Sequence, residues 1–144
     1  MSSFIIIILQ PFVQIFLQLI KGFVDFLAKR HLVKLIQDCL VETLADQAKG
    51  LGGTVSLDWD QGMLFPFPDK GSRTFWMKDM LLPIDIVWIK DDGTVLSVEG
   101  SIATSTYPTV FRPAEPIRYA LEVRAGLAAE RGWEAGTPLS LPIR

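Results

Sequence analysis

The sequence predicts a mainly β domain of the α+β class: a small, antiparallel, β-barrel-like unit with two short helices, preceded by a hydrophobic N-terminal helix. Three observations support this prediction. Between Gly62 and Lys90, three short runs rich in Phe, Trp, Ile and Val are separated by turn residues, as is typical of consecutive strands. Asp92-Gly93 is a strong signal for a two-residue hairpin turn. Residues 4–28 form a nearly continuous apolar block.

Composition limits the chemistry available to the chain. Its 144 residues suffice for one domain with a real core. The formal charge of −2, without a Lys/Arg cluster interleaved with aromatic residues, argues against nucleic acid as a partner. Because Cys39 is the one cysteine and His31 the one histidine, neither an internal disulfide nor a zinc set of His and Cys can be assembled. We therefore expect no metal and no cofactor.

The apolar block at residues 4–28 has five polar positions at helical spacing: Gln10, Gln14, Gln18, Lys21 and Asp25. On a helix these positions form one narrow polar stripe. The block is long enough to cross a bilayer, although its glutamines and Pro11 make insertion marginal. The alternatives are a membrane anchor, an amphipathic helix at the membrane interface, and a helix packed on the domain or on a partner. We expect membrane association, and the basic residues after the block favour a cytoplasmic domain.

The predicted domain boundary separates the N-terminal helix, residues 1–31, from a globular part, residues 32–144. In the globular part, residues 32–41 are expected to form a first strand. Residues 44–50 are expected to form a short helix that ends at a cluster of glycines.

The Asp92-Gly93 turn sets the expected register of the strands on its two sides. It pairs Val87 with Val98 and Ile89 with Leu96. These four side chains then share one apolar face of the sheet.

Asp85 lies on that same face in the predicted hairpin, opposite Gly100. A carboxylate that points inward needs a partner, because burying an unpaired charge is costly. We expect it to accept a hydrogen bond from Lys78, from Arg73 or from nearby backbone amides.

The remainder of the chain is less regular. Residues 101–117 contain three prolines and are expected to form either a functional flap or an extended connection. Residues 118–124 alternate as a strand does, residues 126–131 are expected to form a short helix, and residues 137–141 a last edge strand.

Four segments of the sequence, GMLFPF, TFWMKDMLLPIDIVWI, TYPTVFRP and RYALEVRAGLAAERG, together resemble domain-of-unknown-function family 192 over about residues 35–141. The resemblance implies a compact, β-rich, barrel-like domain with two short helices and no established activity. Members of the family often follow an export or lipoprotein signal, which implies a location in the prokaryotic cell envelope and leaves the side of the membrane open. The chain departs from the family pattern at Glu42–Gln47 and at Gly53-Thr54, where arginines are usual.

Two functions from different classes fit these observations. The first is a non-catalytic, membrane-associated binding or accessory domain, with a groove between the sheet and residues 101–117 that takes a small molecule, a glycan or a peptide. The second is a hydrolase that uses Asp85 and Glu122 as a carboxylate pair. The candidate groove residues are Arg73, Trp76, Lys78, Asp85, Tyr107, Phe111 and Glu122.

Overall fold

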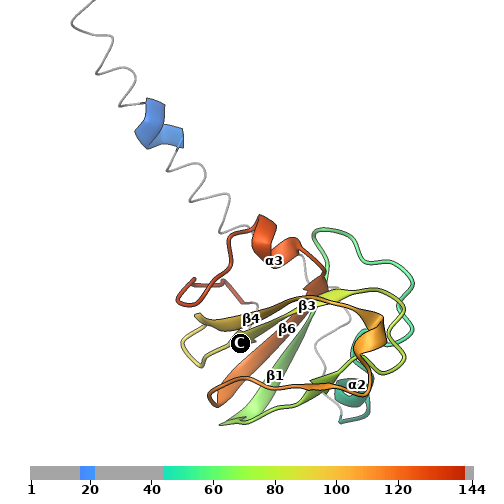
Figure 1. Cartoon of the computed structure of the whole chain (residues 1–144). Helices are drawn as coiled ribbons and strands as arrows, with labels where there is room; N and C mark the ends of the chain where they lie inside the picture. The colour runs from blue at the N-terminus through green and yellow to red at the C-terminus, as the bar shows by residue number, and fades with distance from the viewer. Residues whose placement is uncertain (1–16, 22–43, 142–144) are drawn as a thin grey trace, which may run out of the picture. The chain divides into compact units, whose positions relative to one another are not determined.

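The computed structural model describes residues 17–21 and 44–141 (Figure 1). The chain divides into two compact units, Met1–His31 and Leu32–Arg144, and each is described by itself. In the first unit, residues 17–21 are helical. The rest of the predicted N-terminal helix and the strand predicted at residues 32–41 lie outside the described residues. Across the two described ranges, no helix has the length and apolar character needed to span a bilayer.

The second unit is mainly β, which confirms the predicted fold class. Its described elements are α2 (Leu44–Lys49), β1 (Gly62–Gly71), β2 (Phe75–Trp76), β3 (Ile84–Ile89), β4 (Val95–Ile102), the 3-10 helix η1 (Thr104–Thr106), β5 (Val110–Phe111), β6 (Ile117–Arg124) and α3 (Leu127–Glu130). The short helices α2 and α3 and the strand β6 lie where the sequence predicts them.

The strands form two antiparallel sheets that are not closed into one barrel. The main sheet has four strands in the order β1-β6-β3-β4, and β2 pairs with β5 in a separate two-stranded ribbon. The order of the three apolar runs after Gly62 suggests three neighbouring strands of one sheet. In the structure these three runs are not neighbours in one sheet. β6 lies between β1 and β3, and β2 pairs with β5 outside the main sheet. Between β2 and β3 the chain passes through Asp79, whose φ is 58°.

The hairpin between β3 and β4 confirms one predicted pair and corrects the other. Gly93 has a φ of 81°, the left-handed conformation that the turn requires. Val87 lies opposite Val98, as predicted, but Ile89 lies opposite Val95 instead of Leu96. The register shifts between Trp88 and Ile89, so one extra residue near the turn moves the pairing by one position.

The predicted last strand at residues 137–141 is reduced to one bridge, between Thr94 and Pro138. Pro138 has no N–H group and cannot extend a ladder. Hydrogen bonds from the Val95 amide to Thr137 O and from the Leu139 amide to Gly93 O attach this segment to the hairpin.

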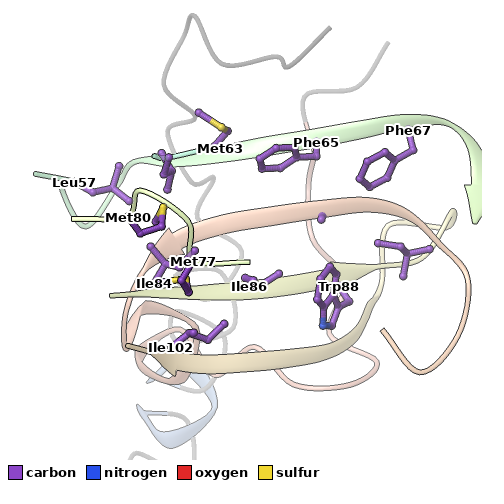
Figure 2. Close-up of a cluster of buried hydrophobic side chains, with 13 residues drawn as sticks. Leu57, Met63, Phe65, Phe67, Met77, Met80, Ile84, Ile86, Trp88 and Ile102 are labelled. Carbon is purple, nitrogen blue, oxygen red and sulfur yellow. The ribbon is translucent and has the colours of Figure 1, made fainter. Parts of the chain in front are cut away.

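Both faces of the main sheet are buried. On one face, side chains of β1, β3 and β6 pack against Leu51, Leu57, Met77 and Met80. Figure 2 shows Phe65 and Phe67 along β1 and Ile86 and Trp88 along β3 in this first cluster. On the opposite face, a second cluster packs against residues of α3 and Trp133. Side chains of one strand alternate between the two clusters, so neighbouring residues of β3 and β6 have different surroundings.

Candidate ligand-binding site

A cleft with a volume of about 460 Å³ opens on the side of the first cluster. Its lining comes from the end of α2 and the glycine that follows it, from β1, from β2 and the segment that leads into it, from Met80, from the first residue of β5 and the residue after that strand, and from one residue of β6. We call it the Glu122 cleft. Its lining residues are Gln47, Ala48, Lys49, Gly50, Phe65, Phe67, Ser72, Arg73, Thr74, Phe75, Trp76, Met80, Val110, Arg112 and Glu122.

Glu122 is the acidic residue of this lining, and its side chain is 4% exposed. The Leu51 amide donates a hydrogen bond to its Oε2 at 3.1 Å. Burial raises the pKa of the Glu122 carboxyl from 4.5 to about 7, and the Leu51 amide opposes this effect only in part. Glu122 is therefore a protonatable group that titrates near neutral pH inside a cleft.

Gly50 is required by the backbone that approaches Glu122. Its φ is 52°, a conformation that L side chains rarely adopt. A Cβ at this position would lie 3.0 Å from Glu122 Oε2. A side chain at this position would strain the backbone and crowd the carboxylate, so glycine favours the loop conformation that places the Leu51 amide on Glu122.

Arg73 is fixed on the wall of the cleft. Its Nη2 donates to Asp69 Oδ1 at 2.6 Å and to Asp69 O at 2.9 Å. Its guanidinium carbon lies 4.5 Å from the centre of the Phe67 ring, within the range of a cation–π contact. The Nε atom of Arg73 is buried and has no hydrogen-bond partner in the structure.

Trp76 forms an exposed aromatic edge of the cleft and is 49% exposed. Its ring lies 6.2 Å from that of Tyr107, centre to centre, in an edge-to-face arrangement. On the paired strand, Val110 lies opposite Trp76 and also lines the cleft. An exposed Trp beside a cleft gives a ligand a flat apolar surface for contact.

Asp85 lies on the other face of the sheet. It accepts hydrogen bonds from three backbone amides: Ser101 at 2.7 Å, Gly126 at 3.0 Å and Ala128 at 2.9 Å. The sequence left Lys78, Arg73 and backbone amides as possible donors to Asp85, and the structure shows backbone amides in this role. These bonds attach the start of α3 and the end of β4 to β3.

The two carboxylates of the hydrolase hypothesis do not face each other. In the pairing of β3 with β6, Asp85 lies opposite Val123 and Ile86 lies opposite Glu122. Glu122 thus shares a face with Ile86, whereas Asp85 shares the opposite face with Val123. A carboxylate pair that acts on one substrate needs both groups on the same side, so this geometry does not support the hydrolase.

Of the seven predicted groove residues, Arg73, Trp76 and Glu122 line the cleft. Lys78 is exposed at the turn after β2, and Asp85 lies on the far face. The remaining two lie beside the cleft: Tyr107 contacts Trp76, and Phe111 packs against the first cluster.

Sequence analysis missed the contributions of Lys49, Gly50 and Arg112 to the cleft. The glycine cluster that begins at Gly50 was the available signal, but it fits a simple helix end equally well. Within residues 17–21 and 44–141, no three side chains of His, Cys, Asp or Glu are grouped in a way that could hold a metal ion.

Comparison with known proteins places the chain in a family. It belongs to the DUF192 family, described as "Uncharacterized ACR", which it matches over residues 29–141. This confirms the resemblance seen in the sequence. No curated protein matches the chain.

Two solved structures resemble the fold. One is a protein of Sinorhizobium meliloti 1021 described as a proposed transcription regulator, with a TM-score of 0.62, 29% identity, and coverage of 65% of this chain and 72% of that one. The other is a protein of unknown function from Novosphingobium aromaticivorans DSM 12444, with a TM-score of 0.61, 34% identity, and coverage of 65% and 66%.

Proposed function

We propose that this member of the DUF192 family is a non-catalytic binding domain whose ligand occupies the Glu122 cleft. One observation carries the proposal: a cleft of about 460 Å³ combines a buried carboxyl group with aromatic walls and a fixed arginine. Small-molecule sites typically have such a volume, apolar walls and a few placed polar groups. Residues 101–117 contribute Val110 and Arg112 to the lining, which supports a groove between this segment and the sheet as the ligand site.

Binding is favoured over hydrolysis by the composition of the cleft. Among its lining residues in the described part of the chain, Glu122 is the one carboxylate, and neither His nor Cys is present. A hydrolase with two carboxylates needs a second acid within several Å of the first. Glu122 alone, with its single amide hydrogen bond, is suited to holding a ligand.

Replacement of Trp76 by alanine tests where the ligand binds. A panel of small molecules, glycans and peptides is screened against the full chain by tryptophan fluorescence and calorimetry. Any ligand of the cleft should bind about fivefold more weakly to Trp76→Ala, because an aromatic contact of this kind contributes on the order of 1 kcal/mol. Trp59→Ala is the matched control, since Trp59 is 44% exposed but contacts Arg124 outside the cleft. Equal affinities for the two variants would contradict the proposed site.

We further propose that the N-terminal segment holds the domain at a membrane of the cell envelope. The support is the apolar block at residues 4–28, with its single polar stripe. Membranes from expressing bacteria should retain the full chain after carbonate extraction, whereas a chain that begins at Leu32 should be released. Full-length protein found wholly in the soluble fraction would exclude a spanning helix.

A further inference from the structure

The carboxyl group of Glu122 has no cationic partner in the described part of the chain. The ion pairs described there join Lys70 to Asp91 and Arg73 to Asp69. Glu122 receives one hydrogen bond, from the Leu51 amide to Oε2, and its side chain also lines the cleft. A buried carboxylate normally has a cation or several donors around it, because its desolvation is otherwise uncompensated. The missing partner can be supplied by a ligand.

We propose that the Glu122 cleft binds a small zwitterion, an amino acid or a short peptide, with its ammonium group against Glu122 and its carboxylate toward Arg112 and Lys49. This inference rests on the proposed function and names the ligand class of the same cleft.

An ammonium group fits Glu122 better than a neutral or an anionic group does. An ammonium group donates N–H hydrogen bonds to Oε1 and also carries a full positive charge. A hydroxyl group can donate a hydrogen bond but carries no charge. The cleft also presents four aromatic side chains, Phe65, Phe67, Phe75 and Trp76, and aromatic rings attract cations through their faces. A ligand with only a carboxylate would instead bring a second anion toward Glu122 once that residue is ionised.

The cations of the cleft explain why the ligand also carries a carboxylate. Lys49 comes from α2, Arg73 precedes β2 and Arg112 follows β5. Arg73 is already paired with Asp69, whereas neither Lys49 nor Arg112 has an ion pair with a described residue. A ligand with an ammonium group alone would meet these two positive charges unpaired. A zwitterion satisfies both signs of charge in the one cleft.

The size of the cleft agrees with this ligand class. A volume of about 460 Å³ has room for an aromatic amino acid or a dipeptide. An aromatic side chain of the ligand would find Trp76 and Met80 among the lining residues. The test below therefore uses phenyl compounds that differ in their charged groups.

The experiment measures binding to the full chain at about pH 7.5 by calorimetry. The probes are L-phenylalanine, the dipeptide phenylalanyl-glycine, 2-phenylethylamine, which lacks the carboxylate, and 3-phenylpropionate, which lacks the ammonium group. We expect L-phenylalanine or the dipeptide to bind at least about tenfold more tightly than either singly charged compound, since each lost charge-assisted hydrogen bond costs about 1.5–3 kcal/mol. The first two probes distinguish a free amino acid from a peptide as the source of the zwitterion.

Glu122→Gln is the decisive variant, because it keeps the shape of the side chain and removes its charge. It should weaken binding of the zwitterion at least about tenfold and leave 3-phenylpropionate unaffected or improved. Glu130→Gln, an exposed change on α3, is the matched control and should bind like the wild type. Circular dichroism of both variants verifies that they are folded.

The pH dependence gives an independent readout. Between about pH 6 and pH 8, L-phenylalanine keeps its ammonium group while Glu122 loses its proton. Affinity should therefore rise across this interval for the wild type and stay flat for Glu122→Gln. The other charged groups that line the cleft are Lys49, Arg73 and Arg112.

Three results would overturn the inference. They are tighter binding of 3-phenylpropionate than of L-phenylalanine, unchanged affinity in Glu122→Gln, and no binding by any of the four probes. If a neutral glycan or another class of ligand from the wider panel instead binds in a Trp76-dependent way, the proposed binding function stands and the zwitterion assignment fails.

Discussion

Asp85→Ala should lower the free energy of unfolding by roughly 2–4 kcal/mol, because it removes a buried acceptor shared by three backbone amides. Asp85 is 1% exposed, so water cannot easily replace the lost hydrogen bonds. The Ser101 amide belongs to β4, and the Gly126 and Ala128 amides belong to the start of α3. The substitution thus loosens both elements from β3.

Guanidinium denaturation of the full chain measures this effect as a shift of the midpoint at constant slope. Asp91→Ala is the matched control: Asp91 is exposed and forms a surface ion pair with Lys70 at 3.3 Å. Such pairs contribute less than about 1 kcal/mol. Asp85→Asn should have an intermediate effect, because its amide group keeps one acceptor oxygen and replaces the other with a donor. Unfolding of Asp85→Ala at the wild-type midpoint would show that the three hydrogen bonds do not stabilise the domain.

Local patterns in the sequence determine much of the main sheet. The Asp92-Gly93 turn requires a left-handed residue, and Gly93 has that conformation, so the β3–β4 hairpin could be predicted together with the Val87–Val98 pair. Alternation along β6 likewise assigns Tyr119 and Glu122 to opposite faces. Both features depend on residues close together in the chain.

The remaining features depend on pairings between distant segments. β6 enters the sheet between β1 and β3, and no local pattern specifies which strands it joins. The ribbon of β2 and β5 is a pairing of this kind too: it brings together Phe75 and Phe111, 36 residues apart. Short apolar runs indicate that strands exist, but their neighbours are chosen by packing in the whole domain.

The candidate site shows the same limit. Asp85 and Glu122 both looked suited to one acidic pair, but the register of β3 against β6 puts them on opposite faces. A shift of one residue in that register would have reversed the result, and the sequence alone does not determine the register. The contact between the Leu51 amide and Glu122 spans 71 positions of the chain, so the role of the segment after α2 could not be predicted either.

Glu122 should make the stability of the domain fall as the pH rises through neutrality. Below about pH 4.5 the carboxyl is protonated in both the folded and the unfolded chain and has no effect on the balance between them. Between about 4.5 and 7 the unfolded chain loses the proton first, because burial raises the pKa of Glu122 in the folded state to about 7. The unfolded state is thereby favoured by an amount that grows to about 3 kcal/mol and then stays constant above that pH.

Glu122→Gln isolates this contribution from that of the other acidic groups. Glutamine fills nearly the same volume, can accept the hydrogen bond from the Leu51 amide and does not ionise. The difference in unfolding free energy between Glu122→Gln and the wild type should therefore increase in favour of the variant from about pH 5 to pH 8, by on the order of 3 kcal/mol. Glu130→Gln, at an exposed position of α3, should follow the wild type at every pH. If the difference in unfolding free energy between Glu122→Gln and the wild type stayed constant over this interval, the folded state would already provide Glu122 with a charge partner. The argument that a ligand's ammonium group binds to Glu122 would then fail.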